Sequence, residues 1–170
     1  MAEHVKFYDF SVEVKDALDD TIKAWIIETA GEVASKAKRG CVMEDDKGKQ
    51  LKNSYAWKTE NDGKKANVGS PLESAYWEEW GTGEYAAHRD GRKGWWIYTP
   101  GQTSVGNGAT YETQEEAERM AAYIRARYKK QAIATNGRMP NYTLEKAFEQ
   151  TKNPATAELN RRVKERMGGK

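Results

Sequence analysis

The sequence predicts an α+β fold, in which a long N-terminal helix and shorter C-terminal helices pack on a small antiparallel β-sheet. Apolar residues recur every three or four positions between residues 16 and 38, which is the spacing of one helix face. Alternating residues on both sides of Asp62-Gly63 predict a β-hairpin. Helical spacing returns after residue 112. We expect one α+β domain over residues 1–150, followed by a helical extension over residues 151–170.

The composition is that of a polar protein without a strong net charge. Charged residues make up 32% of the 170, the mean hydropathy is −0.96, and six Trp and nine Tyr supply large apolar areas. A net charge of +2 gives no general attraction to nucleic acid. Cys41 is the one cysteine, so no intrachain disulfide is expected. No signal-peptide core and no apolar run of about 20 residues occurs, so we expect a soluble cytosolic product without membrane contact.

The first third of the chain predicts a strand, a long helix and a loop. Residues 4–14 alternate between apolar and polar side chains, as in a strand or an extended arm. Residues 16–38 predict one long helix, with Asp16 as its N-cap and Gly40 as its stop. Its apolar face consists of Leu18, Ile22, Trp25, Thr29, Val33 and Ala37. Residues 41–50 are expected to form a charged loop.

The middle of the chain combines a hairpin with an aromatic segment. Residues 54–60 and the strand around Ala66 and Val68 form the two arms of the predicted hairpin. Residues 74–83 then place Tyr76, Trp77 and Trp80 around two adjacent carboxylates, Glu78 and Glu79. Aromatic residues at this density are expected to be buried in a core or pressed against a partner. A sharp turn at Gly81-Thr82-Gly83 leads into a basic, glycine-rich loop over residues 84–94.

The last part of the chain is expected to be mainly helical. Residues 95–98 predict a short strand and residues 101–110 a loop. Thr113 and Glu116 form a capping box at the start of a helix over residues 113–133, which Asn136-Gly137 is expected to stop. Its predicted apolar face is Ala117, Met120, Ala121, Ile124 and Tyr128. A short helix with Leu144, Ala147 and Phe148 follows, and Pro154 starts a last amphipathic piece.

No constellation of residues predicts an enzyme. The sequence has no P-loop, no HExxH and no CxxC, and its two histidines, His4 and His88, are far apart. Gly81-Thr82-Gly83 lacks the βαβ context of a dinucleotide site and is interpreted as a turn. We therefore expect no catalytic residue, no cofactor and no metal site. Glu78 and Glu79 point in different directions on a helix or a strand, so we expect one to be solvated and the other to cap or to pair with a basic residue.

The basic loop allows three interpretations. His88, Arg89, Arg92 and Lys93 are a solvated surface loop, a contact with an acidic patch of another subunit, or a contact with DNA phosphates. The tryptophans that follow, Trp95 and Trp96, alternate in direction. One of them is expected to face the core and the other a neighbouring molecule or groove.

Three motifs resemble the phage-morphogenesis family of tail-completion, or head–tail joining, proteins of long-tailed bacteriophages. The first motif comprises Gly48, Leu51, Lys52 and Ser54. The central one comprises Ala75, Trp77, Glu79, Trp80, Gly81, Thr82 and Gly83. The closing one comprises Gly137, Pro140, Leu144 and Ala147. The resemblance covers roughly residues 15–150. The chain departs from the family pattern at Ser74, usually tyrosine, at Glu78, usually apolar, and at Thr143, where an aromatic is common.

This resemblance implies a non-enzymatic virion protein of the neck or head-proximal tail that works in a ring, with six-fold order expected. Its implied partners are copies of itself, other neck and tail proteins, and DNA in the ring lumen by non-specific contact. The candidate interface residues are Trp77, Trp80, Tyr85, Arg89, Arg92, Lys93, Trp95 and Trp96. The alternatives are a tail terminator of the same region and a DNA-binding accessory protein.

Overall fold

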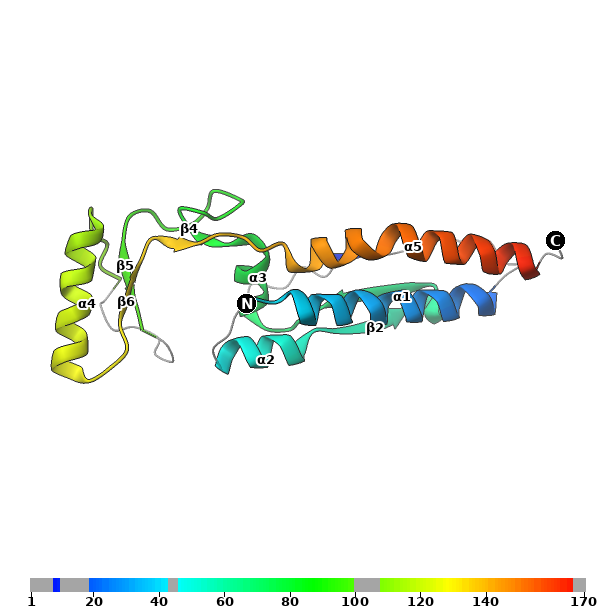
Figure 1. Cartoon of the computed structure of the whole chain (residues 1–170), viewed down its shortest axis with the longest axis horizontal. Helices are drawn as coiled ribbons and strands as arrows, with labels where there is room; N and C mark the ends of the chain where they lie inside the picture. Colours follow the sequence, from blue (N-terminus) through cyan, green and yellow to red (C-terminus); the bar gives the residue numbers. More distant parts are fainter. Residues whose placement is uncertain (1–7, 10–18, 43–45, 100–107, 167–170) are drawn as a thin grey trace. The chain divides into compact units, whose positions relative to one another are not determined.

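Residues 8–9, 19–42, 46–99 and 108–166 are described by a computed structural model, and the predicted α+β fold is confirmed (Figure 1). The chain divides into unit 1, residues 1–79 and 141–170, and unit 2, residues 80–140. Each unit is described by itself below. The boundary predicted at residue 150 falls within a continuous helix and stays a prediction.

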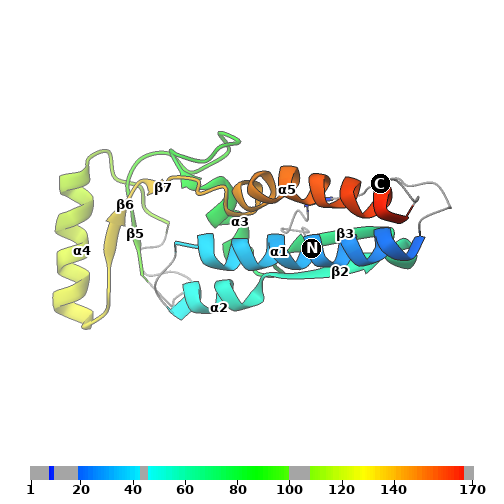
Figure 2. The same ribbon diagram turned by 45° about the vertical axis from the view of Figure 1, so that its right-hand side comes forward.

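Unit 1 has three layers, with one helix between a sheet and a second helix. The sheet has the antiparallel order β1-β3-β2, and Trp57 pairs with Val68 across its hairpin. Helix α1 contacts β2 and β3 with one side and α5 with the other (Figure 2). The elements are β1 Tyr8–Asp9, α1 Asp19–Gly40, α2 Asp46–Ser54, β2 Ala56–Glu60, the 3-10 turn η1 Asn61–Gly63, β3 Lys65–Gly69, α3 Glu73–Trp80 and α5 Thr143–Arg166.

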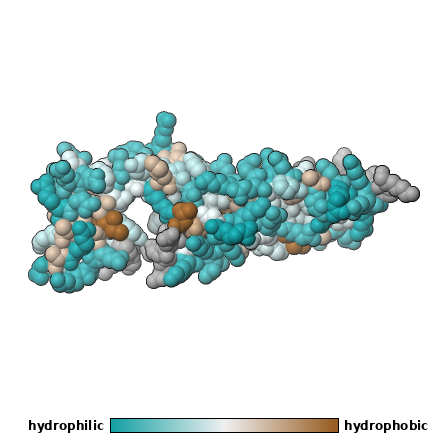
Figure 3. Space-filling model, in the orientation of Figure 1, coloured by the Kyte–Doolittle hydropathy of each residue, from teal (hydrophilic) through white to brown (hydrophobic). Residues whose placement is uncertain are grey.

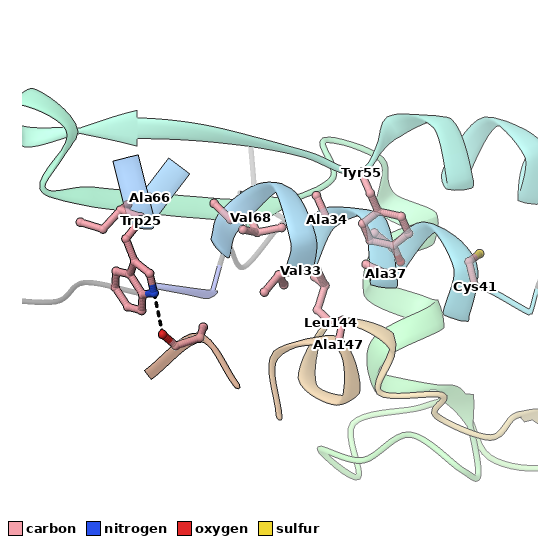
Figure 4. Packing of buried hydrophobic residues seen from close by; sticks show 14 of the residues in the cluster. Trp25, Val33, Ala34, Ala37, Cys41, Tyr55, Ala66, Val68, Leu144 and Ala147 are labelled. Carbon is pink, nitrogen blue, oxygen red and sulfur yellow. Dashed lines mark hydrogen bonds between the residues drawn. The ribbon is translucent and has the colours of Figure 1, made fainter. Parts of the chain in front are cut away.

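The core of unit 1 forms where α1 meets the sheet and α5 (Figure 4). Val33, Val68 and Leu51 are essentially inaccessible to solvent. The Trp25 indole packs in the same cluster, and its Nε1 donates to the Ala155 carbonyl oxygen of α5 at 2.7 Å. Because the indole N–H is satisfied inside the core, Trp25 can bury its ring there at little polar cost.

The long N-terminal helix and the hairpin are confirmed. The described part of helix α1 begins at Asp19, and the helix ends at Gly40, two residues later than predicted. The hairpin turn at Asp62-Gly63 has both residues at positive φ, 55° and 83°. Of the predicted strand over residues 4–14, the structure describes Tyr8–Asp9 as β1, which pairs with β3. The remainder of that strand and the predicted Asp16 cap lie outside the described residues.

The predicted charged loop at residues 41–50 is wrong in its second half. Helix α2 begins at Asp46, and it buries Gly48 and Leu51, which are three positions apart. A helix that buries so few positions shows little apolar periodicity in its sequence. Its many charged residues therefore led to the prediction of a loop. The Ser54 hydroxyl at its end donates to the Leu51 carbonyl and lies 2.6 Å from the Ser70 hydroxyl, which fixes the entry into β2.

The predicted break before Pro154 is also wrong, because α5 runs through it from Thr143 to Arg166. Proline lacks the N–H that would bond to the carbonyl four residues earlier, which is Gln150. In unit 1 the Lys36 ammonium of α1 donates to that carbonyl at 3.1 Å. A tertiary contact thus satisfies the acceptor that the proline leaves open. None of the described helices is long and apolar enough to cross a membrane.

Unit 2 is a helix on a two-stranded ribbon, with a second short ribbon. Strand β5 Trp96–Tyr98 pairs with β6 Ile133–Thr135, and β4 Thr82–Gly83 pairs with β7 Gly137–Arg138. Helix α4 Gln114–Tyr128 packs on β5 and β6. Its small core consists of Ala121, Ile124 and Ala132, with Ile97 and Ala134 packed against it.

Helix α4 confirms the predicted start and corrects the predicted end and face. The Thr113 hydroxyl accepts from the Glu116 N–H, as the capping box predicts. The helix ends at Tyr128 because Lys129 turns left-handed, before the predicted stop at Asn136-Gly137. Its buried face is Ala117, Ala121 and Ile124, whereas Met120 and Tyr128 are 38% and 53% exposed. The predicted apolar face was too wide because the ribbon beneath the helix has only two strands.

Tyr55 is the largest fully buried side chain of unit 1. Its hydroxyl meets no partner with hydrogen-bond geometry among the described residues. Burial raises the pKa of this phenol above its ordinary value, and the nearby Cys41, Glu78 and Glu79 raise it further; the Thr143 hydroxyl, which is close but outside hydrogen-bond geometry, lowers it. Because the Tyr55 pKa is higher in the folded state than in the unfolded state, the folded protein keeps its full stability below about pH 10. Above that pH the unfolded chain ionises first, and the free energy of unfolding falls.

We therefore expect Tyr55→Phe to be at least as stable as the parent at pH 7, because a buried hydroxyl without a partner costs roughly 1 kcal/mol or more. Between about pH 10 and pH 11 the parent should lose more stability than the variant. Urea unfolding followed by circular dichroism at each pH measures both effects. Tyr128→Phe, which is 53% exposed at the end of α4, is the control and should behave as the parent. Equal alkaline losses in Tyr55→Phe and the parent would contradict this assignment.

Candidate assembly surface

The two carboxylates of the central motif are both buried within unit 1. Glu78 is 0% and Glu79 is 2% exposed, although α3 is a short helix near the surface. The expectation that one of them is solvated is wrong. The expectation that one caps is confirmed for Glu79, whose Oε2 and Oε1 accept from the N–H groups of Leu144 and Glu145 at 2.8 and 3.0 Å. Glu79 therefore caps the first turn of α5 from a distant part of the chain.

Glu78 connects three other segments of unit 1. Its Oε1 accepts from the Val42 N–H and from the Asn141 amide, both at 2.9 Å, and from the Thr143 hydroxyl at 3.3 Å. The Asn141 amide also donates to the Gly40 carbonyl at 2.9 Å, at the end of α1. The carboxylate thereby holds the end of α1 and the start of α5 together. This arrangement is structural, since the three donors at Oε1 all come from the chain itself.

Two departures from the family pattern meet at this point. The resemblance implied an apolar residue at Glu78 and an aromatic at Thr143; here the Thr143 hydroxyl donates to the Glu78 carboxylate in the core. A buried carboxylate needs hydrogen-bond donors, and a threonine in place of a large ring supplies one and leaves room.

The candidate interface residue in unit 1 is Trp77, on α3. Its side chain is 39% exposed, while Ala75 on the same helix is buried. A tryptophan that exposes this much apolar surface is typical of a contact residue. The other seven candidates belong to unit 2.

The segment from Trp80 to Gly94 is held by backbone turns. The N–H groups of Ala87 and Ala86 donate to the carbonyls of Trp80 and Gly83 at 2.8 and 3.2 Å. Glu84 closes the loop, because its carboxylate accepts from the Gly94 N–H at 3.2 Å and from the Asn136 amide at 3.1 Å. The basic loop is thus presented on a defined backbone next to the β4–β7 ribbon.

Aromatic and basic side chains alternate over this loop. The rings of Trp80 and His88 lie 4.8 Å apart, and the Arg92 guanidinium lies 5.3 Å from the Trp96 ring centroid. Arg92 also donates to the Thr110 hydroxyl at 2.9 Å and to the Gly108 carbonyl. We call the surface formed by these held side chains the platform; it consists of Arg92 and the half-buried Trp80, Trp95 and Trp96.

Three candidates project from that platform into solvent. Tyr85 is 40% exposed, and Arg89 and Lys93 are exposed as well. Among the residues that the structure describes, no cluster of three or more histidine, cysteine, aspartate or glutamate side chains could hold a metal ion. This surface has the side chains of a binding site. Aromatic rings lie beside Arg92, which hydrogen bonds hold in place, and beside the exposed Arg89 and Lys93.

Sequence reasoning missed the residues that hold this scaffold together. Glu84, Asn136 and Asn141 each join backbone or side chains from distant parts of their unit. Acidic and amide residues in loops carry no periodic signal, and their partners lie 52 to 101 positions away. The one available signal was a glycine beside each of these contacts: Gly83 and Gly137 in the ribbon, and Gly40 as the last residue of α1.

Residues 6–87 match the model of the HK97-gp10_like family, described as "Bacteriophage HK97-gp10, putative tail-component". The matched segment contains the hairpin and the central motif, and it ends within the basic loop. The resemblance is thereby confirmed over residues 6–87, which contain the first two motifs, and a structural role in a bacteriophage tail is supported; the closing motif lies outside the match. No curated protein and no solved structure matches the chain.

Proposed function

From its bacteriophage tail-component segment, we propose that the chain is a non-enzymatic structural protein of a phage neck or tail, completing the tail or joining head to tail as one subunit of a ring. The family match over residues 6–87 is the observation that carries this proposal. The site of action is the virion. The partners are other copies of the chain, in a ring of expected six-fold order, and the adjoining neck and tail proteins.

Ring closure requires one patch of each subunit to meet a different patch of its neighbour. The platform around Trp96 and Arg92, with the exposed Tyr85, Arg89 and Lys93, supplies one such patch. Aromatic and arginine side chains are the usual anchors of protein contacts, because they bury large areas at fixed geometry. Trp77 offers a second exposed aromatic on unit 1.

The test is complementation of a phage that lacks this gene. Tyr85→Ala combined with Arg89→Glu removes exposed contacts, together with one long hydrogen bond of 3.5 Å from the Asn136 amide to the Tyr85 hydroxyl. We expect the titre of infectious particles to fall at least about tenfold, because removing two anchors costs several kcal/mol of binding. Lys164→Glu, exposed on α5, reverses a charge elsewhere and should complement fully.

Labelled protein in purified particles decides the proposal itself. A label at the neck or the head-proximal end of the tail supports it, and absence of the chain from complete particles would overturn it. A label that caps the tail tube alone would favour the tail-terminator alternative. Normal titres with the double variant would reject this patch as an interface.

Contact with DNA is a second candidate function, favoured by the exposed side chains of Arg89 and Lys93. Phosphate contacts of this kind are non-specific and weaken steeply with salt. A mobility shift with duplex DNA at low salt, lost in Arg89→Glu with Lys93→Glu, would support it. No shift at micromolar protein would remove it.

A further inference from the structure

One side of α4 carries a line of four exposed residues that lie outside the core of unit 2, although the Tyr123 ring meets the Tyr128 ring of the same helix edge-on, with centroids 6.4 Å apart. Glu116, Met120, Tyr123 and Arg127 follow each other at intervals of four, three and four, so they lie along one stripe of the helix. Met120 is 38% and Tyr123 is 55% exposed, and the two charged residues are exposed as well. The helix packs on β5 and β6 through its other side (Figures 1 and 2).

The order of these residues is symmetric about the helix centre. Met120 and Tyr123 are equally far from the midpoint between Ala121 and Ala122, and so are Glu116 and Arg127. Two copies of the stripe laid antiparallel would therefore set each Glu116 against an Arg127, and each Met120 against a Tyr123. Every charge in that arrangement meets its opposite, and every apolar side chain meets an apolar one.

We propose that two copies of this chain pair through α4, in an antiparallel contact with a two-fold axis at the helix centre. A two-fold contact needs a patch that is complementary to itself, and the stripe on α4 meets this requirement. Methionine fills irregular gaps against an aromatic ring and gains from sulfur–ring contact. Antiparallel helices also bring the opposite ends of their macrodipoles together.

The helix dipole alone explains part of the pattern. Acidic residues in the first turn and basic residues in the last stabilise a single helix, which accounts for Glu116 and Arg127. It does not account for the exposed Met120 and Tyr123 between them. The core beneath α4 is small, with Ala121, Ile124 and Ala132 as its buried residues, so unit 2 gains from covering more of the helix. The surface seen in Figure 3 is mostly hydrophilic, with small apolar patches.

The contact is weak and reversible. A helix of 15 residues is about 22 Å long, so the pair buries less than a standard interface. It joins two free chains and is separate from the ring contact proposed above, because a two-fold contact does not run head to tail around a ring.

Charge reversal tests the pairing by its symmetry. In Glu116→Arg both charged pairs become Arg against Arg, and in Arg127→Glu both become Glu against Glu. Each variant alone should dimerise at least about tenfold more weakly than the parent in sedimentation equilibrium between about 5 and 500 μM. An equimolar mixture of the two should form heterodimers at parental strength, because every pair is then Arg against Glu. The doubly reversed chain should also pair normally.

Glu115→Arg is the matched control, since it changes the same first turn away from the stripe. It should dimerise as the parent does, and circular dichroism should show equal helix content in all variants. A parent that stays monomeric to the highest concentration would overturn the proposal. So would dimers that survive either single reversal, or a mixture that fails to associate. Failure of the ring proposal is detected separately, by the absence of the chain from particles.

Discussion

Glu79→Ala should lower the free energy of unfolding of unit 1 by about 3 kcal/mol. The carboxylate accepts from two backbone N–H groups at the start of α5, Leu144 at 2.8 Å and Glu145 at 3.0 Å. Its removal leaves these donors without their acceptor beside a buried side chain, and it also removes a negative charge from a helix N-terminus. Urea unfolding followed by far-ultraviolet circular dichroism measures the loss.

The control is Glu73→Ala, which removes an exposed carboxylate from the first turn of α3. It should cost no more than about 0.5 kcal/mol. Glu79→Gln retains one acceptor oxygen and should fall between the two alanine variants. If Glu79→Ala and Glu73→Ala unfold alike, the cap contributes nothing and the motif glutamate has another role.

Gly83→Ala should disrupt the β4–β7 ribbon and destabilise unit 2 by about 3 kcal/mol or more. Gly83 has a φ of +63°, which disfavours any side chain. A Cβ there would also collide with the Asn136 carbonyl oxygen and the Trp96 ring. Because one of these atoms is backbone, the neighbours cannot move aside at small cost. Hydrogen exchange of the Glu84 N–H, which donates to Asn136 at 2.9 Å, reports the loss of this ribbon.

Gly108→Ala separates the two causes. Gly108 has a similar φ of +69°, but a Cβ there would meet no atom of the described residues within 4 Å. Its substitution should cost only the conformational term, about 1 kcal/mol. Equal effects of Gly83→Ala and Gly108→Ala would show that close packing at Gly83 does not matter.

These two predictions explain why the central motif contains Glu79 and Gly83. Glu79 caps a helix that begins 64 positions later, and Gly83 allows two backbones to approach closely. Both roles are structural, so the motif stabilises the fold that presents the platform and does not itself make the proposed contacts. The exposed residues that follow it, Tyr85, Arg89 and Lys93, carry the proposed contacts.

The sequence by itself determined the elements whose signals are local. The long period of α1, the Asp62-Gly63 hairpin and the Thr113–Glu116 cap depend on residues within a few positions of each other, and the structure has all three. The family resemblance belongs here as well, because a motif is a local pattern.

Only the tertiary structure decided the features that depend on distant partners. Pro154 lies inside a helix because Lys36 satisfies the Gln150 carbonyl, and Glu78 and Glu79 are buried because residues 141–145 donate to them. The exposed stripe of α4 exists because the ribbon beneath the helix is two strands wide. In each case the feature is stabilised by a contact between residues far apart in the sequence. The periodicity of apolar residues along the chain does not indicate such a contact.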